Sequence, residues 1–238
     1  MTSFLSAFAW LADHANWAGP SGIPARLAQH LAVTGLVMLI ATAIALPTGI
    51  LVGHTRRGAG VIGAIAGAAR AIPTLGLLTL FGLAIGIGLR APMLALIVLA
   101  IPSLLAGAYA GIQSVSEDVT DAARATGMSE SQIVLQVEIP LAAPVIIGGL
   151  RSATLQVVST ATLAAYVADS GLGRYLFAGL KSRDYPQMLG GALLVIAMAL
   201  ILEVLLGAVQ RLVSSRVTNP GSRPTKGRTP HPLTEGMS

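Results

Sequence analysis

The sequence predicts an all-α membrane protein with about five transmembrane helices, its N-terminus outside and its C-terminus in the cytoplasm. Hydrophobic residues make up 54% of the 238 residues and charged residues only 11%, whereas a soluble domain carries about a quarter charged residues. Mean hydropathy is +0.76. The uncharged stretch at residues 31–53 would rise ~35 Å as a helix, enough to cross the ~30 Å core of a bilayer. An ordinary soluble globule and a disordered chain are therefore excluded.

The first 29 residues contain aromatic side chains but too short an apolar run to span a membrane. Asp13 and Pro20 interrupt the run, which also contains Trp10 and Trp17. Tryptophan prefers the membrane–water interface. We therefore expect residues 1–29 to form an extracytoplasmic, interfacial segment.

Five apolar stretches follow, and each is long enough to cross the bilayer as a helix. Pro47, Pro73 and Pro102 fall inside them, where a membrane bundle tolerates the resulting kinks. The transmembrane domain is expected over residues 30–213, with spans near residues 31–53, 61–87, 91–112, 141–167 and 187–213.

Three of these spans contain an ionisable residue: Arg70, Arg151 and Glu203. An isolated charge in lipid is costly. We expect Glu203 to pair with Arg151 or Arg70, or the three side chains to reach toward the interface, and we regard both arrangements as structural.

The orientation follows from the lysines and arginines, which are more frequent in cytoplasmic loops. Placing the N-terminus outside puts Arg56, Arg57 and Arg124 inside, together with the basic tail. Residues 214–238 are rich in Pro, Gly, Ser and Thr, and they are expected to be a disordered cytoplasmic tail.

The longest polar stretch between spans covers residues 113–140 and lies on the cytoplasmic side in this topology. Residues 114–117 follow a capping-box pattern that opens a helix, and residues 129–132 repeat it. Gly127 between them favours a left-handed helix end, and Pro140 disfavours helix at the residue before it. The prediction is a helix, a turn and a second helix. These residues alone are equally consistent with a docking element for another protein and with an amphipathic hairpin that lies on the bilayer.

Within this loop, Asp121-Ala122-Ala123 precedes Gly127 by three residues, and nine more residues lead to the run 137–140. This spacing resembles the EAA signature of ABC-importer permeases, E-A-A-x3-G-x9-I-x-L-P. The resemblance implies that the loop is the coupling helix, which docks in a groove of a separate cytoplasmic ATPase subunit. The implied coupling residues are Asp121, Ala122, Ala123, Gly127, Met128, Val137, Ile139 and Pro140, with Asp, Val and Ile replacing the signature's Glu, Ile and Leu.

Residues 71–76, 143–154, 160–165 and 171–173 resemble the permeases of glycine betaine/carnitine/choline importers. The resemblance extends from about residue 31 to residue 213 and implies a type I ABC-importer permease bundle in a bacterial cell membrane. It implies a pathway for glycine betaine, choline, carnitine or proline betaine. The implied partners are cytoplasmic ATPase subunits, a second permease copy or a paralogue, and an extracytoplasmic solute-binding protein.

Several chemistries have no support in the sequence. The phosphate-binding motif G-x-x-x-x-G-K-[ST] does not occur, so ATP is expected on the partner subunit, and this chain is expected to be no enzyme. There is no cysteine, and the four histidines are scattered, which gives no metal or catalytic set and no cofactor site. Nucleic acid is not an expected partner, because the +5 net charge is concentrated in the tail and aromatic residues make up only 4%.

Other functions remain open at this point. A related importer for another small solute, such as an amino acid, fits the same loop. A secondary transporter would need ionisable groups near the midplane or discontinuous helices in paired halves, while a membrane enzyme or a structural subunit has no specific signal. The few aromatic residues are spread apart, so a quaternary-ammonium cage is expected in the binding protein, and Tyr109, Tyr166 and Tyr175 are expected to be interface anchors.

Overall fold

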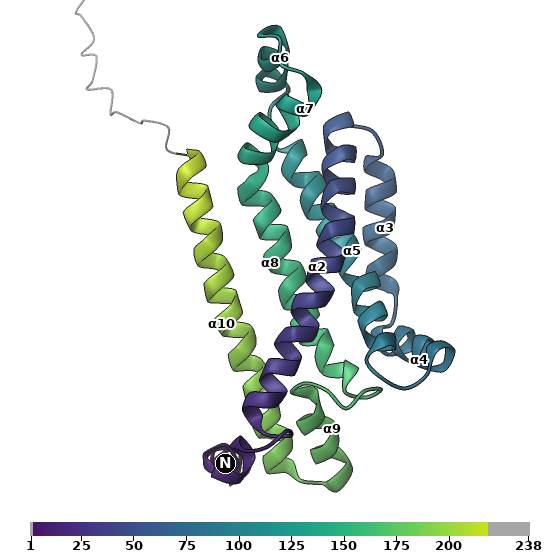
Figure 1. Cartoon of the computed structure of the whole chain (residues 1–238), viewed down its shortest axis with the longest axis vertical. Coiled ribbons are helices and arrows are strands. Elements are labelled where there is room, and N and C mark those ends of the chain that lie inside the picture. The colour runs from purple at the N-terminus through teal and green to yellow at the C-terminus, as the bar shows by residue number, and fades with distance from the viewer. Residues whose placement is uncertain (1, 219–238) are drawn as a thin grey trace, which may run out of the picture.

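The computed structural model describes residues 2–218, apart from the side chains of residues 2, 3, 59, 70, 216 and 218. The described residues form an elongated bundle of helices without strands (Figure 1). Four helices are long and apolar enough to cross a membrane, and a bent helix pair raises the number to five. The elements are α1 (Thr2–Ala12), η1 (His14–Trp17), α2 (Ile23–Thr55), α3 (Ala59–Ala71), α4 (Thr74–Ile85), α5 (Arg90–Gln113), α6 (Glu117–Ala125), α7 (Glu130–Ile133), η2 (Val134–Glu138), α8 (Ile139–Ala164), α9 (Gly173–Ser182) and α10 (Tyr185–Thr218).

The core lies where α2, α5 and α8 pack together, around Val37, Leu96 and Val157. Small residues bring these helices close. A Cβ atom on Gly107 of α5 would lie 2.8 Å from the Cα atom of Gly149 on α8. Close packing of this kind holds helices together in lipid, which offers no hydrophobic drive for their association.

The second predicted span is not one continuous helix. Helices α3 and α4 meet at 82°, so the kink predicted at Pro73 is a complete break between two helices. Pro73 explains the break, because Pro disfavours helix at the residue before it. Ile72 accordingly adopts an extended conformation (φ −73°, ψ 120°) and Pro73 precedes the first residue of α4.

Two other predicted boundaries are corrected. Helix α2 begins at Ile23 rather than near residue 31, because Pro24 occupies the first turn, where a helix does not need its missing N–H. Helix α2 thus begins eight residues before the predicted start of the first span. Helix α10 continues to Thr218, past the predicted start of the tail at residue 214, and residues 219–238 lie outside the described residues.

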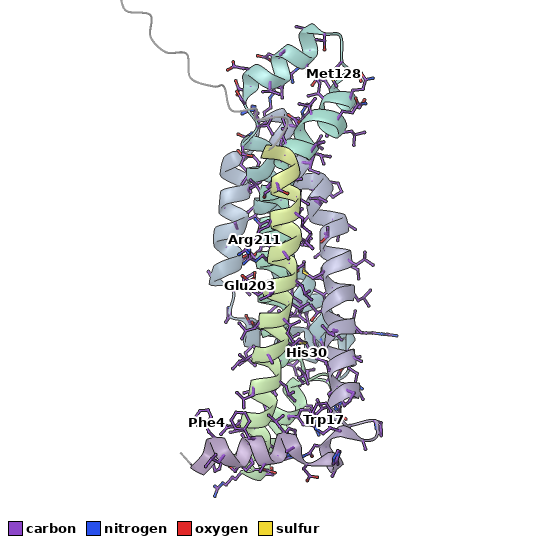
Figure 2. The ribbon with its side chains drawn as sticks, turned by 90° about the vertical axis from the view of Figure 1, so that its left-hand side faces the viewer. Phe4, Trp17, His30, Met128, Glu203 and Arg211 are labelled. Carbon is purple, nitrogen blue, oxygen red and sulfur yellow. The ribbon has the colours of Figure 1, made fainter. Side chains whose placement is uncertain are left out.

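The two ends of the bundle differ. Helices α6 and α7 lie at one end with the C-terminal end of α10, whereas α1 and α9 lie at the other (Figure 1). Helix α1 lies across the end that carries α9, and Phe4 and Trp17 lie near this end (Figure 2). The side chains of Phe4, Phe8 and Trp17 are 59%, 60% and 48% exposed, as an interfacial segment requires.

Tyr175 is not an exposed interface anchor. It is only 8% exposed, its ring packs edge-on against Trp10 with centroids 5.1 Å apart, and its hydroxyl donates to the carbonyl of Ser21 at 2.6 Å. Tyr109 also packs against the core, while Tyr166 is 63% exposed. The sequence prediction for Tyr175 is wrong because Trp10 and Ser21, which are distant in the sequence, contact its ring and its hydroxyl.

Candidate coupling site

The loop between α5 and α8 folds as a helical hairpin, formed by α6, α7 and the turn between them, which we call the coupling hairpin (residues 117–133). Ser116 caps α6 by accepting a hydrogen bond from the N–H of Asp118 at 3.3 Å, so the capping box predicted at residues 114–117 is wrong, and the N-cap lies two residues later. The second predicted capping box is confirmed: Ser129 and Gln132 satisfy each other's backbone N–H groups. The hairpin therefore has a defined start on both helices.

Gly127 ends α6 in the left-handed conformation that the sequence predicts, with φ +87°. The N–H of Gly127 donates to the carbonyl of Arg124 at 2.9 Å, and the N–H of Met128 donates to that of Ala123 at 3.3 Å. This pair of bonds is the Schellman motif, which satisfies the carbonyls left free at a helix end. The turn is therefore fixed by backbone geometry rather than by side-chain packing.

The second helix of the hairpin does not stop before α8. Helix α7 continues through η2, a π-helical turn, into α8, so Ile139 is helical although Pro140 was predicted to disfavour helix there. The N–H of Ile139 bonds to the carbonyl of Val134, five residues back. This wider turn accommodates Pro140 at the start of α8, where its missing donor and its ring do least harm. Residues 130–164 therefore form one uninterrupted helical path from the hairpin into the membrane.

Ion pairs join the two helices of the hairpin. The guanidinium of Arg124 donates to Asp121 at 2.8 Å and to both carboxylate oxygens of Glu130 at 2.9 and 3.1 Å. The hydrogen bonds from Arg124 lower the pKa of the Glu130 carboxyl below its ordinary value. Glu130 therefore stays ionised across the physiological pH range, and the pair holds α6 against α7.

The last turn of α2 also contacts the hairpin region. His54 lies between two carboxylates, with Nδ1 2.7 Å from Glu138 and Nε2 3.1 Å from Glu130. Arg56 pairs with Glu117 at 3.1 Å. Sequence analysis missed His54, Glu130 and Glu138 as members of this site. The available signal was Glu138, a carboxylate in an apolar run, because a buried carboxylate requires a partner.

The residues of the EAA-like pattern divide between an exposed and a buried face. Asp121, Ala122 and Gly127 are exposed, whereas Ala123 is buried. Ile139 packs against a small cluster at the base of the hairpin, formed by Ile112, Val115 and Ala142. Met128 and Val137 are half-buried and Pro140 is exposed, and Figure 2 places Met128 at the tip of the molecule. The pattern thus combines residues that are buried within or beneath the hairpin with residues that are exposed on its surface.

Of the three charges within the predicted spans, the structure brings two together. Arg151 of α8 donates through Nε to Glu203 of α10 at 2.8 Å and makes a second contact with the same carboxylate. Gln210 accepts from Arg151 at 3.0 Å and donates to the carbonyl of Pro144 at 3.0 Å. The side chain of Arg70 lies outside the described residues. This polar cluster connects α10 to α8 through side-chain hydrogen bonds.

The described residues thus form a bundle of apolar spans, with a capped hairpin at one end that continues as a helix into α8. The chain belongs to the family described as binding-protein-dependent transport system inner membrane component, which matches residues 45–219. It is thus an inner-membrane component of an ABC transporter, a family in which ATP is hydrolysed by a separate subunit.

Curated relatives include the choline transport system permease protein OpuBB of Bacillus subtilis, 30% identical over 77% of this chain and 84% of the relative. The osmoprotectant import permease protein OsmY of Salmonella typhimurium is 33% identical over 78% of this chain and 80% of its own length. Among solved structures, an inward-facing MetNI methionine ABC transporter matches with TM-score 0.69 and 22% identity, over 79% of this chain and 94% of the other. That likeness shows the type I importer permease fold.

Proposed function

We propose that this chain forms the translocation pathway of an ABC importer for a compatible solute of the quaternary-amine class, such as glycine betaine, choline, carnitine or proline betaine. The observation that carries the substrate class is the set of curated relatives. The two described above are named for choline transport and for osmoprotectant import.

The coupling hairpin is the proposed docking site of the ATPase, which binds and hydrolyses the ATP. Ala122 and Gly127 on its free face have short or no side chains and are exposed, so a groove in the partner can approach the backbone closely. The Arg124 ion pairs and the Schellman turn make the hairpin a compact unit. Such a unit can pass a push or pull along the continuous helix into α8.

The other two proposed partners are the solute-binding protein and a second permease subunit. The binding protein docks at the end that carries α1 and α9, and a second copy or a paralogue of the permease covers part of the exposed apolar surface. A hollow of about 160 Å³ opens between α3, α5 and α8. Ser103 and Gln156 line this hollow, and the Ser103 hydroxyl donates to Gln156 at 2.8 Å. Such uncharged polar groups support a path that binds the solute weakly. We place the aromatic cage that binds the ammonium group tightly in the binding protein instead.

Uptake into proteoliposomes tests this proposal. The permease, its cognate ATPase and its binding protein are reconstituted, and radiolabelled choline uptake is measured with and without ATP. We expect ATP-dependent uptake that unlabelled glycine betaine, carnitine or proline betaine suppresses. Uptake suppressed only by amino acids would assign the related amino-acid importer instead, and uptake that follows a sodium or proton gradient without ATP would assign a secondary transporter.

A further inference from the structure

The coupling hairpin has covalent connections to two of the three helices that form the core. Residues 114–116 join it directly to α5, and the π-turn η2 continues it into α8. Helix α2 packs against both α5 and α8 but is separated from the hairpin in sequence by α3, α4 and α5. Movement of the hairpin therefore reaches α2 only through non-covalent contacts.

Hydrogen bonds and ion pairs to the hairpin and its base come from the last turn of α2 and from Arg56, the residue that follows it. The side chain of Gln113 donates to the carbonyl of Gly53 at 2.9 Å, and Arg56 donates to the carbonyl of Val115 at 2.9 Å. Both bonds reach the base of the hairpin, where α5 ends, and Arg56 also pairs with Glu117, the first residue of α6, at 3.1 Å. His54 alone among these α2 residues reaches α7 and η2, the start of the continuous path into α8.

The environment of His54 makes this a strong connection. Its side chain is 13% exposed and that of Glu138 is 3% exposed, whereas that of Glu130 is 57% exposed. A carboxylate oxygen lies within hydrogen-bond distance of each ring nitrogen of His54, and an ionised carboxylate only accepts hydrogen bonds, so an N–H of the ring is the donor in such a bond. Charge-assisted hydrogen bonds are stronger than neutral ones, and a carboxylate as buried as Glu138 cannot lose its partner without a penalty.

We propose that His54 is a positioning residue for coupling. It clamps α7 and η2 to the end of α2, so that a displacement of the hairpin moves α2 together with α8. The role in transport rests on the proposed function, whereas the clamp itself is a property of this chain.

Distances between paired spin labels test the clamp directly. The chain contains no cysteine, so Leu39→Cys, on the exposed face of α2, and Ala125→Cys, on the hairpin, label only those two sites. We expect one narrow distance distribution in the purified chain in nanodiscs. His54→Ala should broaden or shift it, and His54→Gln, which keeps one donor, should give an intermediate result.

Two further variants separate the clamp from loss of the fold. His14→Gln changes an exposed histidine at the opposite end of the molecule and should leave the distribution unchanged. If His54→Ala alone does not fold because Glu138 is left unpaired, the pair His54→Ala with Glu138→Gln removes the stranded charge and should still broaden the distribution. Wild-type distances in the folded His54 variants would overturn the proposal.

Transport gives the second readout. In the reconstituted importer, His54→Ala combined with Glu138→Gln should retain bound ATPase but lower solute uptake per ATP hydrolysed by about fivefold or more, the scale of typical coupling energies. Unchanged uptake per ATP would overturn the role in coupling. If the wild-type importer shows no ATP-driven uptake, the proposed function fails, and the distance measurement still decides whether the clamp exists.

Discussion

At the scale of single residues, Gly127 carries the sharpest prediction. A Cβ atom there would meet nothing within 4 Å, so a substitution is penalised only through its φ of +87°. A β-branched side chain in such a conformation costs on the order of 1–3 kcal/mol. We expect Gly127→Val to weaken retention of the ATPase on the affinity-purified permease.

Asparagine is the matched control for Gly127, because it tolerates the left-handed region better than other residues with a side chain. Gly127→Asn should therefore retain most of the bound ATPase. Equal retention by the valine variant and the wild type would show that the turn does not shape the docking surface.

The Arg151–Glu203 pair carries the second prediction at this scale. Both side chains are 33% exposed, so removing one partner should cost about 2 kcal/mol, less than the 3–5 kcal/mol of a fully buried pair. We expect Arg151→Leu to lower the thermal unfolding midpoint of the purified chain, and Arg151→Leu combined with Glu203→Leu to restore much of it. Arg211→Leu, which changes an exposed arginine of α10, is the control. A midpoint no lower in Arg151→Leu than in the control would contradict a stabilising role for the pair.

These residues also show what sequence can reveal at this scale. The left-handed conformation of Gly127 was predictable because a glycine between two helix-capping patterns most often ends the first helix. His54 was not, because its partners Glu130 and Glu138 lie far away along the chain and only the packing of α2 beside the hairpin brings them together. Local conformation is encoded locally, whereas a charge network depends on the tertiary structure.

At the scale of elements, the prolines also separate what local sequence predicts from what the tertiary structure decides. Pro47 and Pro102 lie inside continuous helices, whereas Pro73 marks the 82° break between α3 and α4. All three lie in apolar stretches, so composition predicts a kink at each and does not say which will break the helix. Neighbouring groups decide whether the freed carbonyls are satisfied, and those neighbours are set by the fold.

The crossing of α5 and α8 gives a prediction for an element pair. Gly107 and Gly149 approach so closely that a Cβ atom on Gly149 would lie 2.8 Å from the Cα atom of Gly107. Overpacking of this kind costs about 1–3 kcal/mol or more. Gly149→Leu should therefore lower the thermal unfolding midpoint of the purified chain, while Gly63→Leu, on α3 where nothing lies within 4 Å of the added Cβ atom, should not. Similar midpoints for the two variants would contradict the observed crossing.

At the scale of the whole molecule, the two ends have different chemistry and the sides are apolar. Large exposed hydrophobic residues on α10 include Leu200, Val204 and Leu212. A single water-soluble chain would not tolerate such a surface, and in a membrane permease lipid or a second subunit covers it. The class of protein was therefore predictable from composition, whereas the division of this surface between lipid and partner depends on the assembly.

The orientation of the molecule is the remaining prediction at this scale, and every proposed contact with the ATPase depends on it. Ala125→Cys on the coupling hairpin and Ser182→Cys on α9 lie at opposite ends of the bundle and are both exposed. A membrane-impermeant maleimide should label Ser182→Cys in spheroplasts, where only the outer face of the cell membrane is accessible. It should label Ala125→Cys only in inverted membrane vesicles. The cysteine-free parent chain is the control for background labelling. Labelling of the hairpin from outside would place the coupling site where no cytoplasmic ATPase can reach it, because the hairpin and the ATP-hydrolysing partner must share one side of the membrane.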